Sequence, residues 1–528
     1  MTQLSHADHS VSPPRITFPR AYNAAADLVE RHMASGRGNE IAFIDDAGSC
    51  SYASLAQRVN RCANAWRRLG LRIEDRAVLL MHDSIDFPIA FLGAIRAGIV
   101  PIPCNTLLTA GEYEFLVSDS RARAVAISAP LLPMIAPLLG RLPFLEHVIV
   151  SGTRVEGATN FADWIAGEAT QSPVAPTTAD DVCFWLYSSG STGTPKGAVH
   201  LQSDLVNTAE LYARPILGIR DSDIVFSAAK LFFAYGLGNG LTFPLAAGAI
   251  AILTAERPTP ASVFRQLITR QPTIFYGVPT LYAAMLASPD FPPREALALR
   301  CCVSAGEALP AELGRRWFER TGVDILDGIG STEMLHIFLS NRPGEVRYGT
   351  TGKPVPGYVM RLTDEAGNAV APGEIGELQV SGPTSSPHYW NNRARSLATF
   401  LGPWTKCGDK YTVDDDGYYT YCGRSDDMLK VGGVYVSPFE VEAALASHEA
   451  VLEAAVVGHA DENELIKPKA FVVVKPSHAA SPELAVQLQD HVKAKLPAYK
   501  YPRWVEFVGE LPKTATGKIQ RFKLRTKA

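Results

Sequence analysis

The sequence has no CxxC motif. Its eight cysteines are scattered along 528 residues. A chain of this length also does not need disulfide staples. Reduced thiols are the simplest interpretation, and we expect a cytoplasmic protein.

A large net charge is missing as well. Lysine and arginine number 50 and aspartate and glutamate 54, which leaves −4 at neutral pH. This balance gives no reason to expect nucleic acid or an anionic membrane as a partner. The first fifteen residues, MTQLSHADHSVSPPR, also lack the apolar run of a secretory signal. We therefore expect small-molecule ligands rather than nucleic acid or a membrane.

Charged residues are absent between Lys230 and Glu256, a stretch long enough to suggest a membrane span. The stretch holds four glycines and Pro244, however, and neither an aromatic belt nor a basic flank frames it. Because these residues sustain an uninterrupted helix poorly, we interpret the stretch as the buried wall of a ligand pocket. A core strand, AIAILTA, is expected to follow.

Strand-like and helix-like segments alternate along the first four-fifths of the chain. RAVLLMHD (76–83) is predicted to be a buried strand, and SIDFPIAFLGAIRAG (84–98) a helix that ends in glycine. The alternation recurs at PTIFYGVP (272–279) with the TLYAAMLAS that follows it, and at LRCCVSAG with LPAELGRRWFERTG. Strands separated by helices predict an α/β fold with largely parallel sheets built from βαβ units.

The pattern of residue types changes near Gly352 and again in the last hundred residues. Alternating residues with Gly and Pro turns predict an antiparallel sheet or small barrel at about 350–425. HEAVLEAAVVGHADENELIKPKAFVVVKP then predicts two antiparallel strands, and Ser481-Pro482 predicts the start of a helix. We expect an N-terminal domain, 1–425, that includes the β-rich subdomain, and a compact α+β domain, 426–528.

YSSGSTGTPKGAVH (187–200) has the composition of a phosphate-binding loop. It follows the predicted strand DVCFWLY, and its small residues let backbone N–H groups approach an anion while Lys196 adds a full charge. The spacing from Gly190 to Lys196 excludes a Walker A loop, which would need glycine where Pro195 stands. A polar surface loop is the alternative interpretation.

Three later segments strengthen the phosphate interpretation. DGIGSTEML (327–335) places Thr332 and Glu333 after a predicted strand and two glycines, which suits phosphate and a bridging divalent cation. Asp409 and Arg424 flank the hairpin DDDGYYTY, where they could grip a ribose diol. LPKTATGKIQR places Lys518 in a loop at the far end of the chain.

With these four motifs in this order, the sequence resembles the adenylate-forming superfamily of acyl-CoA synthetases, non-ribosomal adenylation domains and firefly-type luciferases. The resemblance covers essentially the whole chain. It implies a large N-terminal domain, a small mobile C-terminal domain, and ATP, Mg²⁺ and coenzyme A as ligands. The oligomeric state is not readable from the sequence, and a homodimer stays open.

The resemblance implies a role for each ATP-binding position. The serine- and glycine-rich loop with Lys196 would cover the β- and γ-phosphates, Thr332 would touch the α-phosphate, and Glu333 would hold Mg²⁺. Ile329 stands where the family commonly has an aromatic residue, so adenine would lie on an aliphatic face. The residues expected to bind ATP are Ser188, Ser189, Gly190, Ser191, Thr192, Lys196, Gly306, Glu307, Ala308, Asp327, Gly328, Ile329, Asp409 and Arg424.

The resemblance also identifies Lys518 as the catalytic lysine. Its ammonium would offset the repulsion between a carboxylate and the α-phosphate, and removal of one such group typically costs ~10²–10³ in rate. Asp426 matches the family's hinge position, with Asp427 as the local alternative. Rotation about this hinge would withdraw Lys518 and present KVGG, with Gly432 and Gly433, along a thiol tunnel for CoA.

The acid-binding pocket is expected to combine aromatic, small and apolar residues. No aspartate occurs in FFAY, where amino-acid-activating relatives tend to place one. A flat slot of this kind suits an aryl carboxylate better than a long acyl chain, and these segments most resemble benzoate–CoA ligases. His336 could contact a ring substituent or pack as a core histidine. The expected pocket residues are Phe233, Ala234, Tyr235, Ala305, Gly330, His336 and Ile337.

The predicted function is an AMP-forming acid–thiol ligase that uses ATP. Benzoate or a close analogue would attack ATP to give an acyl-AMP and pyrophosphate, and the CoA thiol would then displace AMP. No carrier-protein segment follows Lys518, so free CoA is the expected acceptor. One alternative is a stand-alone adenylation enzyme that loads a separate carrier protein. The other is a non-catalytic acyl or nucleotide sensor, which would not need to keep Lys196, Glu333, Asp426 and Lys518.

Overall fold

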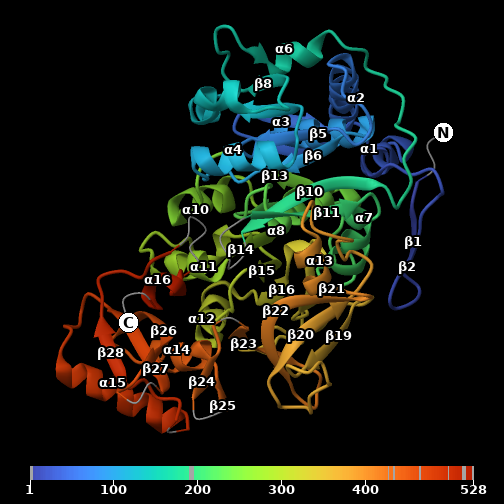
Figure 1. The fold of residues 1–528 in the computed structure, drawn as a ribbon. Coiled ribbons are helices and arrows are strands. Elements are labelled where there is room, and N and C mark those ends of the chain that lie inside the picture. The colour runs from blue at the N-terminus through green and yellow to red at the C-terminus, as the bar shows by residue number, and fades with distance from the viewer. Residues whose placement is uncertain are drawn as a thin grey trace.

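Two parallel sheets and a β-rich subdomain make up the large N-terminal part of the molecule, and a smaller α+β lobe follows (Figure 1). The computed structural model describes residues 4–189, 195–425, 427–431, 434–462, 465–497, 499–513 and 519–525. The boundary predicted at residues 425 and 426 stays a prediction.

The larger sheet is parallel through its centre, as the alternation of strands and helices predicts. At both edges the pairing turns antiparallel. Across the sheet the strands are β18 (Lys353–Pro354), β17 (Ile337–Ser340), β16 (Ile325–Gly330), β15 (Cys301–Ser304), β14 (Ile274–Gly277), β12 (Ile224–Ser227), β13 (Ile250–Ile252), β3 (Ile41–Asp45) and β4 (Gly48–Ser51). The helices that connect the inner strands are α10 (Pro260–Thr269), α11 (Pro279–Ala287) and α12 (Ala311–Thr321).

The second sheet is parallel throughout and lies at the top of Figure 1. Its predicted strand–helix pair is confirmed, and the helix ends at Gly98, whose left-handed backbone a glycine adopts without strain. Across the sheet the strands are β6 (Val100–Pro103), β5 (Arg76–Leu80), β7 (Ala124–Ser128), β8 (His147–Ser151) and β9 (Thr159–Asn160). The helices of this region are α1 (Ala24–Ala34), α2 (Tyr52–Arg68), α3 (Asp86–Ala97), α4 (Ala110–Asp119), α5 (Leu132–Ile135) and α6 (Phe161–Ala166).

An antiparallel ribbon of β10 (Val182–Ser189) and β11 (Pro195–Leu201) lies between the two sheets and the β-rich subdomain (Figure 1). This ribbon carries both described ends of the predicted phosphate loop. At the N-terminus, β1 (His6–Asp8) and β2 (Arg15–Thr17) form a hairpin along the side of the molecule.

The uncharged stretch between Lys230 and Glu256 is helical over most of its length. It forms α8 (Ala234–Leu237), a π-helical turn (Gly238–Thr242) and α9 (Phe243–Ala247) before the predicted core strand, which is β13. As expected, the α-helix is not continuous, since the π turn that separates α8 from α9 contains Gly238 and Gly240. Within the described residues, no helix is long and apolar enough to cross a membrane.

The β-rich subdomain is an antiparallel sheet, as predicted. Its strands are β19 (Val359–Thr363), β20 (Gly376–Ser381), β21 (Phe400–Leu401), β22 (Trp404–Val413) and β23 (Tyr419–Arg424), and α13 (Arg393–Thr399) precedes β21.

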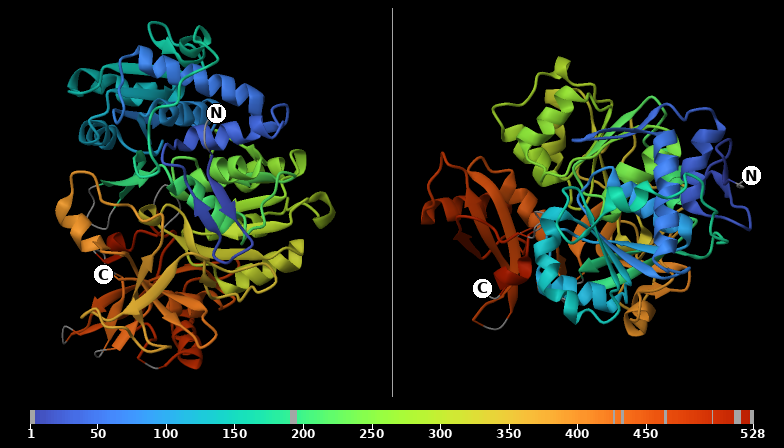
Figure 2. Two further views of the ribbon diagram at one scale, coloured as in Figure 1. Left: turned by 90° about the vertical axis from the view of Figure 1, so that its right-hand side faces the viewer. Right: turned by 90° about the horizontal axis from the view of Figure 1, so that it is seen from above.

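The C-terminal lobe lies to one side of the large part when the molecule is seen from above (Figure 2, right). Its two long strands are antiparallel and the last strand joins them in parallel, while Ser481 caps a helix as the sequence predicts. The strands are β24 (Leu429–Val431), β25 (Val434–Val436), β26 (Val451–Ala460), β27 (Ile466–Val474) and β28 (Trp504–Phe507), and the helices are α14 (Pro438–Ala446), α15 (Pro482–Lys495) and α16 (Arg521–Arg525).

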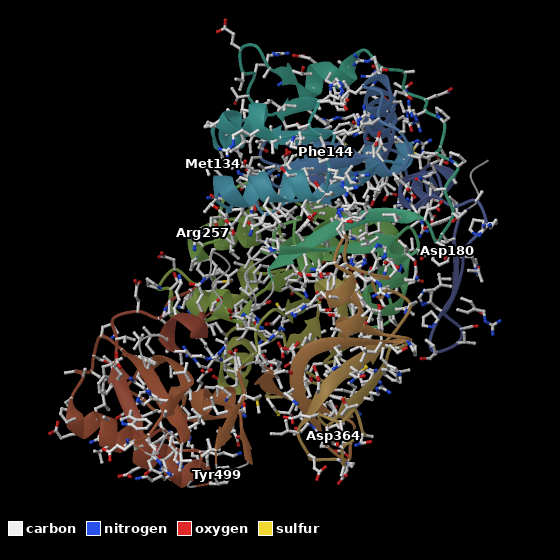
Figure 3. The ribbon with its side chains drawn as sticks, viewed as in Figure 1. Met134, Phe144, Asp180, Arg257, Asp364 and Tyr499 are labelled. Carbon is white, nitrogen blue, oxygen red and sulfur yellow. The ribbon has the colours of Figure 1, made fainter. Side chains whose placement is uncertain are left out.

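Exposed apolar side chains lie far from the centre of the molecule. Met134 and Phe144 are on the outer surface of the second sheet's region, and Tyr499 is at the outer end of the C-terminal lobe (Figure 3). They are isolated surface residues of the kind that most proteins carry.

Candidate active site

The predicted phosphate-binding residues and the Thr332–Glu333 turn meet at one place. β10 and β11 pair so that Ser188 lies opposite Lys196. Glu333 lies in a short 3₁₀ turn, Thr332–Met334, which follows β16 directly. The Lys196 Nζ is 3.1 Å from Oε1 of Glu333, and both side chains are 14% exposed. Both residues were predicted to belong to one site for phosphate and a cation, and in the structure their side chains are in contact.

A tyrosine that the sequence motifs did not identify completes this contact. Lys196 Nζ donates a hydrogen bond to the hydroxyl of Tyr389 at 2.6 Å, and that hydroxyl donates to Oε1 of Glu333 at 2.7 Å. The ammonium also lies over the tyrosine ring, 4.3 Å from its centroid. A signal for Tyr389 does exist, the aromatic pair Tyr389-Trp390 in the polar segment SSPHYWNN, but nothing in it indicates a partner.

The electrostatics keep Glu333 ionised. Burial acts to raise the pKa of its carboxyl, but the charge of Lys196 and the hydrogen bond from Tyr389 outweigh it, so the pKa lies below its ordinary value. Burial and the neighbouring Glu333 raise the pKa of the Tyr389 hydroxyl, which is therefore a neutral donor. The site thus holds an anion and a cation that are both only slightly exposed.

The backbone around Glu333 is fixed by hydrogen bonds from two directions. His200, on β11, places Nε2 2.8 Å from the carbonyl of Thr332, and its Nδ1 is 3.0 Å from the buried Asp204. Ser331 accepts a bond from the N–H of Met334 and caps the turn. His200 is a second residue that the motifs missed, since histidine in PKGAVH has no obvious partner in the sequence.

The predicted adenine slot lies beside this turn, at the ends of β15 and β16. Gly306 has φ +91°, so a glycine suits its backbone, and Glu307 and Ala308 follow it. Burial raises the pKa of the Asp327 carboxyl well above its ordinary value, and Oδ1 has no hydrogen-bond partner among the described residues. Ile329 is partly buried against the core.

The predicted ribose-binding pair lies on adjacent strands of the β-rich subdomain. Asp409 on β22 is directly opposite Arg424 on β23, and Arg424 Nη1 is 3.4 Å from Asp409 Oδ1. The carboxylate is buried and the guanidinium is about half exposed. Two antiparallel strands therefore bring together residues that are fifteen positions apart.

Most of the expected acid-pocket residues line one region between α8, β15 and β17. Tyr235 donates its hydroxyl to the carbonyls of Gly277 and Val303, so that its phenol is held by the ends of β14 and β15. Ala305 and Ile337 are buried, and Phe233, Ala234 and Gly330 are partly exposed.

His336 is a buried neutral imidazole. Its Nε2 is 3.2 Å from both the carbonyl of Tyr235 and Oδ1 of Asn239, which assigns the proton to Nε2. Desolvation lowers the pKa of the imidazole to about 3. Its Nδ1 has no partner in the described chain, so both sequence interpretations, a ring contact and a core histidine, stay open.

Several predicted residues cannot be placed. Ser189 has a described backbone only, and Gly190, Ser191, Thr192, Asp426, Gly432, Gly433 and Lys518 lie outside the described residues.

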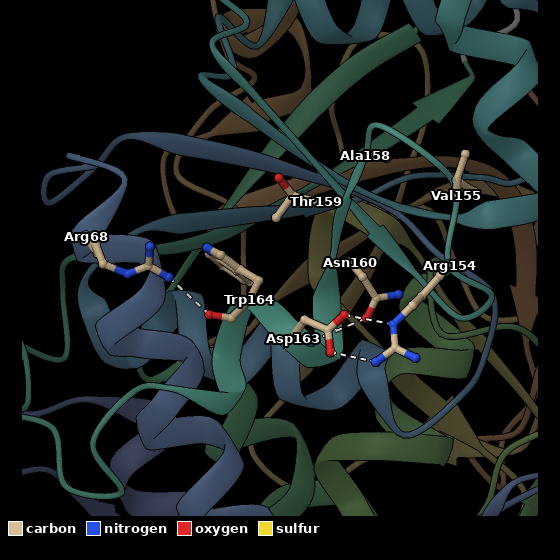
Figure 4. Close-up of a pocket in the computed structure, with 8 residues that line it drawn as sticks. All are labelled: Arg68, Arg154, Val155, Ala158, Thr159, Asn160, Asp163 and Trp164. Atoms are coloured by element: carbon tan, nitrogen blue, oxygen red, sulfur yellow. Dashed lines mark hydrogen bonds and ion pairs between the residues drawn. The ribbon is translucent and has the colours of Figure 1, made fainter.

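A surface hollow of about 450 Å³ lies elsewhere, beside α6 (Figure 4). Its two arginines are paired with acids of the same region, Arg154 with Asp163 and Arg68 with Glu168. These pairs leave the hollow without a concentrated charge, and it is separate from the Lys196–Glu333 site.

Comparisons with known proteins show the family of the chain. Residues 30–390 match the AMP-binding enzyme family, and residues 440–518 match the C-terminal domain of AMP-binding enzymes. The chain is 63% identical to a benzoate–CoA ligase of Thauera aromatica over 528 residues, which is all of both chains. It is 50% identical over 512 residues to a 4-hydroxybenzoate–CoA/benzoate–CoA ligase of Rhodopseudomonas palustris, covering 96% of this chain and 94% of that protein.

A solved structure has the same fold. The benzoate CoA ligase from Burkholderia xenovorans LB400 superposes with a TM-score of 0.90 at 54% identity, and the match covers 96% of this chain and 100% of that one.

Proposed function

Because the chain belongs to the AMP-binding enzyme family, we propose that it is an ATP-dependent aryl-CoA ligase that converts benzoate, or a close analogue, into benzoyl-CoA. The observation that carries the substrate is the 63% identity to a benzoate–CoA ligase over the full length of both chains. The apolar and aromatic region around Tyr235 and His336 is consistent with an aryl acid.

The first half-reaction forms a mixed anhydride. A benzoate oxygen attacks the α-phosphorus of ATP, the bond from that phosphorus to the pyrophosphate oxygen breaks, and benzoyl-AMP remains. This step exchanges a poor leaving group, oxide, for AMP. Lys196 would bind the departing phosphates, and Thr332 would lie at the α-phosphate. The Asp409–Arg424 pair would hold the ribose diol.

Mg²⁺ is part of the proposal. One carboxylate together with phosphate oxygens is a usual donor set for this ion. Glu333 fits that role because its carboxylate is ionised and only slightly exposed. No group of three or more potential metal-ligating side chains occurs within the described residues. When bound, the cation would neutralise charge on the phosphates.

The second half-reaction transfers the aroyl group to CoA. The thiolate sulfur attacks the carbonyl carbon of benzoyl-AMP, the bond from that carbon to the phosphate oxygen breaks, and AMP leaves. We assign Asp426 as the hinge of the domain 426–528, Lys518 to the adenylation state, and Gly432 and Gly433 to the thiol tunnel. The support for these assignments is the motif register in the sequence.

Pyrophosphate release with benzoate, measured with and without CoA, tests the proposed function. We expect benzoyl-CoA, AMP and pyrophosphate in equal amounts when CoA is present, with slow turnover in its absence. Turnover that does not respond to CoA would favour the loading of a carrier protein. Release from no aryl acid at all would contradict an enzymatic function.

A Lys518→Ala variant separates the two half-reactions. Adenylation should fall by ~10²–10³, since one ammonium no longer stabilises the developing charge. Thioester formation from supplied benzoyl-AMP should stay within about threefold of wild type, because that step has no pyrophosphate to form. Equal losses in both steps would contradict the assignment of Lys518.

A further inference from the structure

One short segment of the β-rich subdomain connects the two charged residues of the phosphate site. Residues 384–390, here called the bridging segment, lie alongside β11 on one side, where the N–H of Trp390 donates to the carbonyl of Gly197 at 2.8 Å. On the other side, the N–H of Ser386 donates to the carbonyl of Glu333 at 2.7 Å. The same few residues thus fix the backbone beside Lys196 and the backbone of Glu333.

Tyr389 extends this connection to the side chains. Tyr389 is 2% exposed, and the centroid of its ring lies 5.1 Å from that of Phe400. Its backbone N–H donates to the hydroxyl of Ser396. The ring is therefore held firmly by packing, and the hydroxyl has one place to lie. That place is between Lys196 Nζ at 2.6 Å and Glu333 Oε1 at 2.7 Å.

The two hydrogen bonds have a directional consequence. Tyr389 occupies Oε1 of Glu333 and accepts one of the three N–H bonds of Lys196. The ammonium also lies 3.1 Å from the same Oε1, so one of its three N–H groups is left for a phosphate oxygen, and the second carboxylate oxygen, Oε2, is left for another ligand. The hydroxyl and the ammonium both hold Oε1, and without the hydroxyl the carboxylate would be free to turn both of its oxygens toward the ammonium, which would leave neither for a cation.

We propose that Tyr389 is a positioning residue that orients Glu333 toward the metal ion of Mg·ATP and Lys196 toward its phosphates. The proposal rests on the proposed function for the identity of the ligand. It assigns no proton transfer to Tyr389, which would keep its hydroxyl hydrogen throughout the reaction. What the residue supplies is an ion pair that is held at one carboxylate oxygen, so that the other oxygen stays available to the ligand.

Tyr389→Phe tests the proposal by removing only the hydroxyl. The probe is α,β-methylene-ATP, whose binding is measured by calorimetry with Mg²⁺ and with EDTA. Hydrogen bonds to charged groups are worth enough that we expect roughly tenfold weaker binding in the presence of Mg²⁺. Binding in EDTA should change by less than about threefold, since the ring and its cation–π contact with Lys196 remain.

A kinetic readout separates positioning from a merely structural role. Adenylation of benzoate by Tyr389→Phe should need a roughly tenfold higher Mg²⁺ concentration for half-maximal rate. Thioester formation from supplied benzoyl-AMP should be nearly unchanged, because it uses neither the cation nor pyrophosphate. Equal losses in the two half-reactions would overturn the proposal, as would unchanged Mg²⁺ dependence of both binding and rate.

Two further variants control the experiment. Tyr348→Phe removes the same kind of bond, from a phenol to the carboxylate of Asp324 at 2.6 Å, outside the site, and should change neither readout.

In a Glu333→Gln background, Tyr389→Phe should have little additional effect on Mg²⁺ dependence if it acts through Glu333. Additive effects would overturn the proposal. The calorimetric measurement does not use benzoate, so it tests the role of Tyr389 even if benzoate is not the substrate. Failure of this proposal and failure of the proposed function are therefore distinguishable.

Discussion

At the scale of single residues, Gly238 packs against the imidazole of His336 with no room to spare. A Cβ added at Gly238 would lie 2.3 Å from Cδ2 of His336, and Phe243 closes the same space at 3.0 Å. The imidazole is itself held by Tyr235 and Asn239. A methyl group at residue 238 therefore has to displace a ring of the proposed acid pocket.

Gly238→Ala is expected to impair benzoate binding more than ATP binding. The displaced imidazole should raise the KM for benzoate by roughly tenfold, and overpacking of this kind commonly costs about 1–3 kcal/mol of stability. Steady-state kinetics with each substrate varied in turn gives the comparison. Gly111→Ala, whose added Cβ meets nothing within 4 Å, is the matched control and should leave both KM values unchanged. A larger change in the KM for ATP than for benzoate would contradict the placement of His336.

The sequence could predict residues that belong to recognisable motifs, but not their connecting partners. Lys196 and Glu333 were predicted because each lies in a motif whose residue types suit phosphate or a cation. Tyr389 and His200 were not, because their partners are 193 and 132 positions away and only the folded chain brings them together. A phenol or imidazole between two such partners leaves no periodicity in the sequence.

At the scale of elements, the short helix α16 is joined to the rest of the C-terminal lobe by a buried ion pair. Arg521 Nη2 is 2.8 Å from Oε2 of Glu442 on α14, and the two side chains are 9% and 10% exposed. Asp427, next to the proposed hinge, accepts from Arg525 and lies 3.7 Å from Arg521. The residues that follow Lys518 are thus tied to the residue that follows Asp426.

Arg521→Met should destabilise the C-terminal lobe. It leaves Glu442 buried without its partner, a change that typically costs about 3–5 kcal/mol. Thermal unfolding followed by hydrogen exchange in β26 and β27 would measure the loss within the lobe. Glu442→Gln in the same chain keeps an acceptor for the N–H of Val456 and should recover most of the stability, since no charge remains buried.

An exposed ion pair supplies the control for that prediction. Arg154 and Asp163 are 2.8 Å apart with side chains 76% and 55% exposed, and Arg154→Gln should have no measurable effect. If Arg521→Met changed the unfolding of the lobe as little as Arg154→Gln does, the Arg521–Glu442 ion pair would not be what holds α16 in place.

The types of most elements could be predicted from the sequence, but one helix shows where prediction stops. Parallel strands, the antiparallel subdomain and the cap at Ser481 follow from local patterns. Between Ala234 and Ala247 the glycines indicated an interrupted helix, but not that the surrounding core holds the segment helical with a π turn in its middle. Tertiary packing overrides intrinsic propensity there.

At the scale of the whole molecule, buried ionisable groups in the large domain couple its stability to pH. Desolvation lowers the pKa of His32 to about 4 and that of His336 to about 3. Desolvation raises the pKa of Asp83 to about 6. His32 bonds from α1 to the carbonyl of Leu245 on α9, so it joins elements that are far apart in the chain.

The signs of these shifts oppose one another. Each histidine has a folded pKa below its unfolded value of about 6.5, so the unfolded chain binds more protons and stability falls as pH falls from about 7 toward 4. At pH 5 each histidine costs about 2 kcal/mol relative to pH 8. Asp83 has a raised folded pKa, so its neutral form returns about 1 kcal/mol as pH falls through 6. Burial also raises the pKa values of Asp204 and Asp327, which act in the same direction as Asp83, so the contribution of one histidine is measured by removing it.

His32→Gln should remove about 2 kcal/mol of this pH dependence, whatever its effect at a single pH. Urea unfolding at pH 5 and pH 8, followed by tryptophan fluorescence, measures this difference, since Trp66 and Trp317 are buried in the large domain. The exposed His6, replaced by glutamine, is the matched control and should leave the difference between the two pH values as in wild type. An identical difference in the His32→Gln variant would mean that the imidazole is not kept neutral by burial between α1 and α9. The acid sensitivity of the large domain would then have to come from other groups.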